Sequence, residues 1–171
     1  KTGVDLQNES EGLLPSVAWK KARGQPWYPG ETVITGIGQG SVLVTPLQLA
    51  QGTASLANGG NRIPLRLVSA TRTGFDQPWV PLPKPTATSI GATAEQLQAI
   101  KTGMQATMHT RRGTGWAIAA GSPYLMAGKT GTVQKISRKG NLSLDPKNLP
   151  LHLRHQALFI GYAPADDPKI A

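Results

Sequence analysis

The fold of this chain is decided by the stretch Leu125-Met126-Ala127-Gly128-Lys129-Thr130-Gly131-Thr132-Val133-Gln134. An apolar lead-in is followed by small and β-branched residues, without proline and without helical spacing of the apolar positions, which predicts an extended strand. A lysine in the middle of such a strand, close to a glycine, suits an edge strand that lines a cleft and binds an extended ligand. An ordinary exposed edge strand protected by a lysine is an equally open interpretation of these residues.

The two faces of the predicted strand carry different groups. Because side chains alternate along a strand, Lys129 and Gly131 are expected on one face, and Thr130 and Thr132 on the other. We expect Lys129 to face the ligand. Strand twist at a sheet edge can also bring a threonine hydroxyl to the rim of the cleft.

The tripeptide Lys-Thr-Gly occurs three times, and its context selects one copy. The copy at 101–103 falls inside the helical pattern expected over 94–108, and the copy at 1–3 leads into a segment too short to interpret alone. Only the copy that begins at Lys129 has an apolar lead-in and a β-compatible exit. The chemistry is therefore expected at Lys129.

Length and composition limit the classes of function. A chain of 171 residues is expected to form one structural unit, and its net charge of +9 favours polyanionic or carboxylate-bearing partners. Its basic residues are dispersed and not interleaved with aromatic residues, so nucleic-acid binding is not predicted. The chain has no cysteine and its three histidines lack metal-ligand spacing, so neither a metal nor another cofactor is expected. No hydrophobic run is long enough to cross a bilayer.

Helix and strand signals alternate along the chain. Two capping boxes, Thr45-Pro46-Leu47-Gln48 and Thr93-Ala94-Glu95-Gln96, predict helices over 47–57 and 94–108. The apolar stripe of the second helix is expected to face the core, and consists of Leu97, Ile100, Met104 and Met108. Further expected elements are short helices over 16–22 and 116–120, strands over 3–6, 32–35 and 63–71, a central strand over 157–164, an aromatic anchor at Trp27-Tyr28, a tight bend at 36–40, a proline-rich hairpin or loop over 74–85 and a long polar connection over 136–154.

Several segments carry a family resemblance and occur in one order along the chain. They are Lys1-Thr2-Gly3-Val4-Asp5-Leu6, Gly36-Ile37-Gly38-Gln39-Gly40, Thr45-Pro46-Leu47-Gln48-Leu49-Ala50, Ala57-Asn58-Gly59-Gly60, Ala127-Gly128-Lys129-Thr130-Gly131-Thr132-Val133-Gln134 and Phe159-Ile160-Gly161-Tyr162-Ala163-Pro164. Together they resemble the transpeptidase domain of penicillin-binding proteins. Pro26-Trp27-Tyr28 and the Gly-Ile-Gly-Gln-Gly form are most similar to the class B, elongation-specific members of the penicillin-binding protein 2 group.

This resemblance implies an α/β (α+β) fold of the penicillin-binding protein and serine β-lactamase type, with helices flanking an antiparallel sheet. It also implies a serine D,D-transpeptidase that cross-links peptidoglycan. In the family, a serine attacks the penultimate D-alanine carbonyl of a stem peptide, D-alanine leaves, and an amine of a neighbouring stem resolves the acyl-enzyme. β-Lactams imitate the D-alanyl-D-alanine terminus and trap the serine.

The resemblance also assigns roles within the motif strand. Lys129 would supply positive potential and a hydrogen bond to the active-site network, and Thr130 and Thr132 would bind the terminal carboxylate of the substrate. Gly131 would let the peptide add along the strand. The backbone N–H of Thr132 is an expected oxyanion-hole donor, which contributes about 3 to 4 kcal/mol in comparable sites.

The nucleophile motif of the family is absent from this sequence. None of the nine serines has a lysine three residues later, and no Ser-x-Asn motif occurs. The resemblance therefore implies that residues 1–171 are the C-terminal portion of one transpeptidase domain, with the nucleophile upstream and the last strand and helix downstream. We expect that this piece alone is not acylated by penicillin.

The implied partners are peptidoglycan stem peptides, β-lactam antibiotics and a membrane glycosyltransferase of the elongation machinery. The implied location is the periplasmic face of the bacterial inner membrane. Two alternatives stay open: a β-lactamase or β-lactam-sensor relative, and a non-enzymatic basic module that binds glycan or nucleic acid, which the net charge alone suggests.

Overall fold

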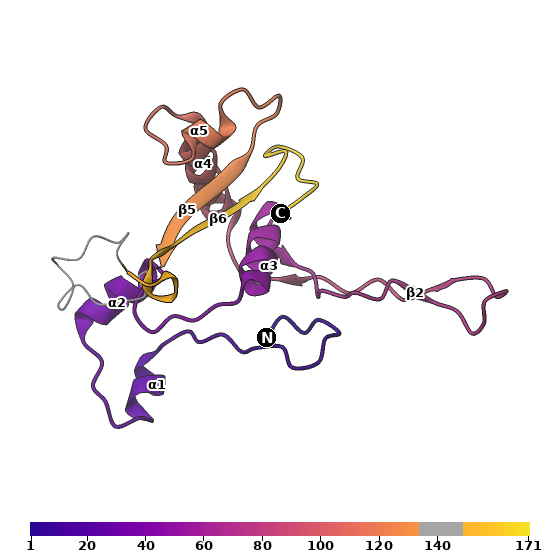
Figure 1. The fold of residues 1–171 in the computed structure, drawn as a ribbon, viewed down its shortest axis with the longest axis horizontal. Coiled ribbons are helices and arrows are strands. Elements are labelled where there is room, and N and C mark those ends of the chain that lie inside the picture. Colours follow the sequence, from indigo (N-terminus) through magenta and orange to yellow (C-terminus); the bar gives the residue numbers. More distant parts are fainter. Residues whose placement is uncertain (134–148) are drawn as a thin grey trace.

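The computed structural model describes residues 1–133 and 149–171 (Figure 1). In chain order the elements are α1 (Val17–Lys21), α2 (Pro29–Gly36), α3 (Pro46–Ala57), β1 (Asn61–Arg62), β2 (Ala70–Thr71), β3 (Val80–Pro81), β4 (Thr88–Ser89), α4 (Ala94–His109), α5 (Trp116–Ala119), β5 (Ala127–Val133), a 3-10 turn at Leu151–Leu153 and β6 (Gln156–Tyr162). All three strand pairs are antiparallel. The predicted mixture of helices and antiparallel strands is confirmed, whereas most of the connection predicted over 136–154 lies outside the described residues.

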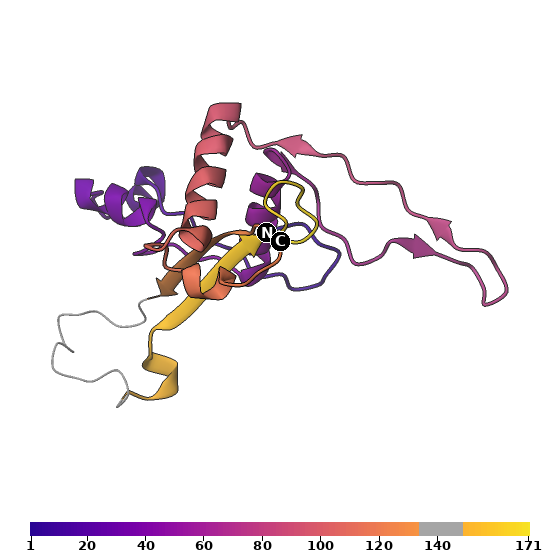
Figure 2. The ribbon, with the colours of Figure 1, turned by 90° about the horizontal axis from the view of Figure 1, so that it is seen from above.

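The pair formed by β5 and β6 is the centre of the fold. Its register runs from Ala127 opposite Tyr162 to Val133 opposite Gln156. Helix α4 packs against β5 and α3 packs against β6, and Figures 1 and 2 show both helices beside this pair. Met104, Ala127, Tyr162 and Ala165 form the buried cluster between them. The strand predicted around Lys129 and its cover of helices are therefore confirmed.

Both predicted capping boxes are present. The Thr45 hydroxyl accepts from the Gln48 N–H, and the Thr93 hydroxyl accepts from the Gln96 N–H. Each glutamine side chain accepts in return from the N–H of its threonine, so both helices begin where the sequence predicts.

The apolar stripe of α4 is only partly buried. Met104 and Met108 are 6% and 0% exposed, which confirms the core-facing prediction for the last two turns. Ile100 is 41% exposed, so the prediction is wrong at that position.

Two glycines allow β5, β6 and α4 to approach closely. A Cβ added at Gly128 would lie 2.7 Å from the Phe159 ring and 2.9 Å from the Met108 sulfur. A Cβ at Gly161 would lie 2.8 Å from the Ala127 carbonyl oxygen. Packing therefore requires glycine at both positions.

The strand predicted over 32–35 is wrong, because these residues lie in α2. The Tyr28 N–H donates to the Glu31 carboxylate (2.9 Å), and Pro29 occupies the first helical position. Lys20 of α1 pairs with Glu31, and this contact lowers the pKa of that carboxyl. Such contacts at the helix start outweigh the strand preference of Thr-Val-Ile-Thr. Tyr28 is 61% exposed, so its predicted role as a core anchor is also wrong.

The strand predicted over 63–71 is reduced to β2 at its end. β1 pairs with β4, and β2 pairs with β3, within one long hairpin arm that projects from the body in Figures 1 and 2. Prolines at 64, 83 and 85 lack the N–H that a continuous ladder needs, which explains the gap between the two pairs. The Arg66 guanidinium crosses this gap and donates to the carbonyls of Leu82 and Pro83. Of the two alternatives predicted for 74–85, a hairpin or a loop, the structure shows a hairpin, but its paired strands are 70–71 and 80–81.

Two other strand expectations are not met. Residues 3–6 form no strand, and the Asp5 carboxylate instead accepts from the N–H groups of Leu67 (2.6 Å) and Val68 (3.0 Å). β6 was expected to be central, yet within the described ranges its one strand neighbour is β5.

The Asp5 tie to the hairpin arm is expected to depend on pH. The two backbone N–H bonds hold the pKa of Asp5 below its ordinary value of 3.8. The stabilisation from these two hydrogen bonds is therefore fully present above that value and is lost as pH falls through the lower folded-state pKa of Asp5. We expect hydrogen-exchange protection of the Leu67 and Val68 amides to fall at acid pH. In Asp5→Ala their protection should be low at every pH, whereas the Leu82 amide, which bonds to the Ser69 carbonyl, serves as control. Unchanged protection in Asp5→Ala would contradict the tie.

Two glycine substitutions in β5 are expected to differ in their effect on stability. Gly128→Ala places a Cβ against Phe159 and Met108 and should lower the free energy of unfolding by about 1 to 3 kcal/mol. At Gly131 the added Cβ would meet only the Leu158 Cβ, at 3.7 Å, so Gly131→Ala should change stability by less than about 0.5 kcal/mol. Denaturant unfolding of the two variants compares them directly, and equal losses would show that packing at Gly128 is not the cause.

Candidate active site

One edge of β5 is free of any strand partner among the described residues. The Leu125 carbonyl accepts from the Ala165 N–H (2.8 Å) on the β6 side, whereas the Met126 N–H donates to His109 Nε2 (3.0 Å) on the opposite side. Because the N–H and C=O of one residue point to the same side in an antiparallel pair, and successive residues alternate, Gly128, Thr130 and Thr132 direct their backbone groups to the free edge.

Lys129 contributes its charge to this free edge. Its side chain is exposed, and the ammonium donates to the carbonyl oxygen of Thr130. That carbonyl belongs to the edge away from β6, so the ammonium bends around the strand toward it. Side-chain alternation puts the Lys129 and Thr130 side chains on opposite faces of β5, but the bend of the Lys129 side chain still brings its ammonium to the free edge.

The Thr130 hydroxyl is held by a residue from another segment. Its Oγ1 lies 2.6 Å from the Oγ1 of Thr114, in the turn between α4 and α5. Gly113 and Gly115 place this turn against the end of α4, since a Cβ at Gly113 would lie 2.2 Å from the Thr107 carbonyl oxygen and one at Gly115 would lie 2.5 Å from the Met108 sulfur. Gly113-Thr114-Gly115 carries only the signal of a helix break in the sequence, so this contact was not predicted.

The Thr132 carbonyl is held from a third segment. Gln39 Nε2 donates to it at 2.9 Å across a sequence separation of 93 residues. Gly38 and Gly40 flank Gln39 with φ angles of 74° and 75°, which confirms the tight bend predicted at 36–40. The glycine spacing was the available signal, but the sequence did not indicate which strand the bend approaches.

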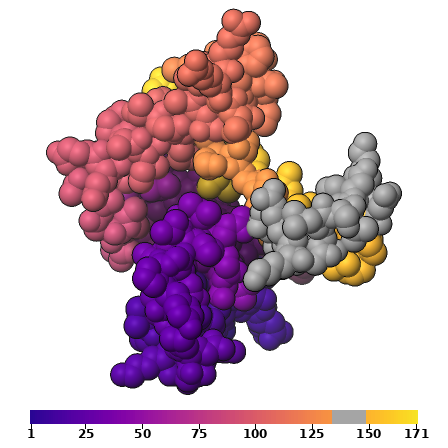
Figure 3. Space-filling view, turned by 90° about the vertical axis from the view of Figure 1, so that its left-hand side faces the viewer, coloured from indigo at the N-terminus to yellow at the C-terminus, as the bar shows by residue number. Residues whose placement is uncertain are grey.

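The three segments converge on one face of the molecule. In Figure 3 the chain before α3, in purple, and the segment with α4 and α5, in salmon, lie on either side of the orange strand β5. The exposed edge of β5 therefore lies between two supporting segments.

Gly131 leaves room at this edge. A Cβ there would make one ordinary contact, so neither packing nor a left-handed φ requires glycine at this position. Close approach of a ligand backbone explains the glycine better than the fold does.

The residues of the other two Lys-Thr-Gly copies are explained by the fold. Thr2 is buried, and its N–H and hydroxyl, with the N–H of Gly3, donate to Glu9, whose pKa they lower. Lys101 lies within α4. Neither of these two copies lies in an exposed strand, which agrees with the selection of the copy at Lys129 from its sequence context.

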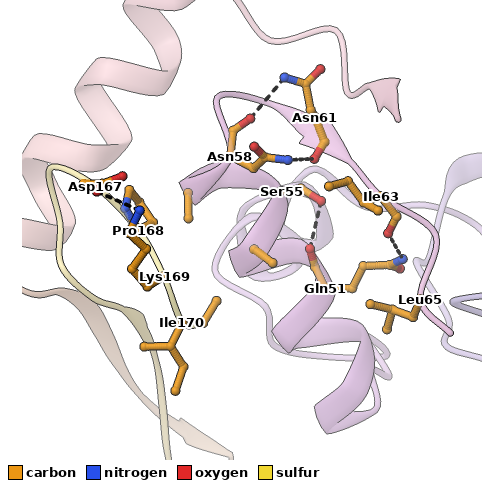
Figure 4. A pocket seen from close by; sticks show the side chains of 13 residues that line it. Gln51, Ser55, Asn58, Asn61, Ile63, Leu65, Asp167, Pro168, Lys169 and Ile170 are labelled. Carbon is orange, nitrogen blue, oxygen red and sulfur yellow. Dashed lines mark hydrogen bonds and ion pairs between the residues drawn. The ribbon is translucent and has the colours of Figure 1, made fainter. Parts of the chain in front are cut away.

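A separate pocket lies away from this edge. A pocket of about 410 Å³ opens between α3, residues 61–65 and residues 167–171, and Gln51, Ser55 and Asn58 line it (Figure 4). It contains no residue of the β5 motif, so the candidate site is the open edge of β5.

The described residues hold no group of three or more potential metal ligands. Within the same ranges no helix has both the length and the apolar character needed to cross a bilayer. The β5 edge itself presents an ammonium, hydroxyl groups and backbone N–H groups. These groups suit an extended, carboxylate-bearing peptide and a developing oxyanion.

Comparison with known proteins identifies the family. The model of the penicillin binding protein transpeptidase domain matches residues 1–171. Peptidoglycan D,D-transpeptidase MrdA of Acinetobacter baumannii is 38% identical over 100% of this chain and 25% of its own length. MrdA of Escherichia coli K12 is 34% identical over 99% of this chain and 27% of its own length. The chain thus spans about a quarter of the length of these relatives.

Solved structures agree in fold. PBP2 of Pseudomonas aeruginosa, in complex with WCK 5153, has a TM-score of 0.70 and 42% identity, and the match covers 97% of this chain and 33% of that one. PBP2 of Helicobacter pylori, in complex with MreC, has a TM-score of 0.72 and 32% identity, over 99% of this chain and 28% of that one. The match includes β5, β6 and the segments that hold them, and the chain belongs to the penicillin-binding protein transpeptidase domain family.

Proposed function

We propose that the protein containing this chain is a serine-type peptidoglycan D,D-transpeptidase of cell-wall elongation, and that these residues supply the carboxylate-binding side of its active site. The observation that carries the proposal is the free edge of β5, where the Lys129 ammonium reaches the Thr130 carbonyl and the Thr132 backbone points outward, with the Thr130 hydroxyl held nearby by Thr114. The MrdA relatives, which are named peptidoglycan D,D-transpeptidases, support the activity.

Binding begins at the terminal carboxylate of a D-alanyl-D-alanine stem peptide. The Lys129 ammonium and the hydroxyls of Thr130 and Thr132 suit this group, because charge-assisted hydrogen bonds are stronger than neutral ones. The peptide lies along the free edge of β5, and Gly131 leaves space for its backbone.

The chemical steps exchange one acyl acceptor for another. A serine hydroxyl attacks the penultimate D-alanine carbonyl and loses its proton to a neighbouring base, and the carbonyl oxygen becomes an oxyanion that accepts from the Thr132 N–H. The tetrahedral species expels D-alanine, whose amine takes up a proton, and leaves a serine ester. An amine of a second stem then attacks the ester, forms the cross-link amide and restores the serine hydroxyl.

The serine is proposed to come from outside these 171 residues. No serine of the chain has a lysine three residues later, as the family nucleophile requires. Residues 1–171 are then the C-terminal portion of one transpeptidase domain, and alone they would not be acylated.

The related structures also support a proposal about partners and location. One related structure is a complex of PBP2 with MreC, and another is described as a peptidoglycan synthase complex that coordinates polymerization and crosslinking. These neighbours support work with the elongation machinery. The proposed partner there is a membrane glycosyltransferase, and the proposed location is the periplasmic face of the inner membrane. β-Lactam antibiotics would act as inhibitors, because they imitate the D-alanyl-D-alanine terminus.

Lys129→Ala in the full-length protein is expected to slow acylation by penicillin by roughly 100-fold, in the range found when an electrostatic group of such a site is removed. Intact-mass spectrometry over time should show one covalently bound β-lactam in the unmodified protein and a slow gain in the variant. Lys101→Ala is the matched control, because Lys101 heads the same tripeptide but lies in α4.

Three outcomes would contradict the proposal. Acylation of Lys129→Ala at the unmodified rate would remove Lys129 from the site. Rapid hydrolysis of the acyl-enzyme would indicate a β-lactamase, and no adduct on the folded full-length protein would indicate a non-enzymatic binding protein.

A further inference from the structure

We infer that Thr114 and Gln39 are positioning residues of this active site, with Thr114 acting on carboxylate binding through Thr130 and Gln39 acting on the acylation step through Thr132. This inference rests on the proposed function. It is carried by two hydrogen bonds that join β5 to segments far from it in sequence.

Thr114 determines what the Thr130 hydroxyl can do. A hydroxyl has one proton to donate and two lone pairs to accept with, and the two threonine oxygens lie 2.6 Å apart. When Thr130 donates to a ligand carboxylate, its oxygen accepts the proton of Thr114, and the chain Thr114 to Thr130 to carboxylate polarises each bond. Loss of the Thr114 hydroxyl leaves Thr130 free to rotate away from the ligand.

The backbone around Thr114 favours this role. The Gly115 N–H donates to the Thr107 carbonyl (3.0 Å), and the Gly113 N–H donates to the Thr110 carbonyl (2.8 Å), so the turn is tied to the end of α4. α4 also packs against β5. Thr114 and Thr130 are therefore held by the same helix and keep their separation.

Gln39 determines the direction of the Thr132 backbone. The last residues of β5, 131–133, are exposed, and the Gln39 amide holds the Thr132 carbonyl on the free edge. The N–H of Thr132 points to the same side as its carbonyl, so the bond also orients the proposed oxyanion donor. The Thr132 carbonyl oxygen has a second lone pair, and Gln39 can stay bound while a ligand N–H donates to the same oxygen.

The backbone that carries the Gln39 side chain is itself held. The backbone N–H of Gln39 donates to the Ile34 carbonyl of α2 (3.0 Å), and the left-handed φ angles of Gly38 and Gly40 turn the chain on either side of it. Gln39 is thus presented from the end of a helix rather than from a free loop.

Substitutions of Thr114 and Gln39 are expected to affect different kinetic constants. In the full-length protein, stopped-flow acylation by a fluorescent penicillin separates the dissociation constant of the initial complex from the rate constant of acylation. Thr114→Val should raise the dissociation constant about tenfold and change the rate constant by less than about twofold, since a bond to a charged ligand is weakened. Thr114→Ser keeps the hydroxyl and should restore binding.

Gln39→Met should show the reverse pattern. Met has a similar length but no donor, so the acylation rate constant should fall about tenfold, as expected for a misdirected oxyanion donor, and the dissociation constant should change little. The matched controls are Thr102→Val, at an exposed position of α4, and Gln98→Met, whose amide bonds to Thr102 on the same helix. Both control variants should be acylated with the same dissociation constant and rate constant as the unmodified protein.

The outcomes separate this inference from the proposed function. If the unmodified full-length protein forms no acyl-enzyme, the proposed function fails and the inference fails with it. If the unmodified protein is acylated and Thr114→Val and Gln39→Met match it, only the inference is overturned. A parallel loss of binding, rate and melting temperature would show a merely structural role and would also overturn it. Thr114→Ala and Gln39→Ala provide second variants should either first substitution prevent folding.

Discussion

The antiparallel pairing of β5 with β6, pressed against α4, is the constraint on which the rest of the structure depends. Gly128 and Gly161 remove the two Cβ atoms that would otherwise collide with Phe159, Met108 and the Ala127 carbonyl. The pairing occupies one edge of β5 and thereby leaves the other for a ligand. A shift of one residue in this register would turn the backbone groups of Thr130 and Thr132 toward β6, so packing and chemistry depend on the same alignment.

Three parts of the chain meet at the free edge of β5. β5 contributes the charge, the hydroxyl and the peptide groups, and the bend at 36–40 and the turn at 113–115 each contribute one side chain that bonds to it. Such support from packed elements is what an active site needs, because donors must already point at the place where charge develops. The net charge of +9 adds a favourable field for an anionic ligand but does not position it.

Local chemistry was enough to predict several elements. The capping boxes at Thr45 and Thr93, the strand around Lys129, the bend at Gly38 and Gly40 and the hairpin over 74–85 all depend on neighbouring residues, and the structure contains each of them. The error at 32–35 occurred where contacts at the start of α2 compete with strand propensity. Residues 32–35 prefer strand but are helical, since Glu31 is held by both the Tyr28 N–H and Lys20.

The sequence by itself predicted the motif strand and favoured Lys129 among three identical tripeptides, because apolar spacing and caps are local properties of the chain, and its resemblance to known proteins indicated the family. Only the tertiary structure decided which edge of β5 is free, that the Lys129 ammonium reaches that edge, and that Thr114 and Gln39 hold Thr130 and Thr132. The physical reason is that a hydrogen bond across 93 residues leaves no periodic trace in the sequence. It exists only once helix and sheet packing have brought its two ends together.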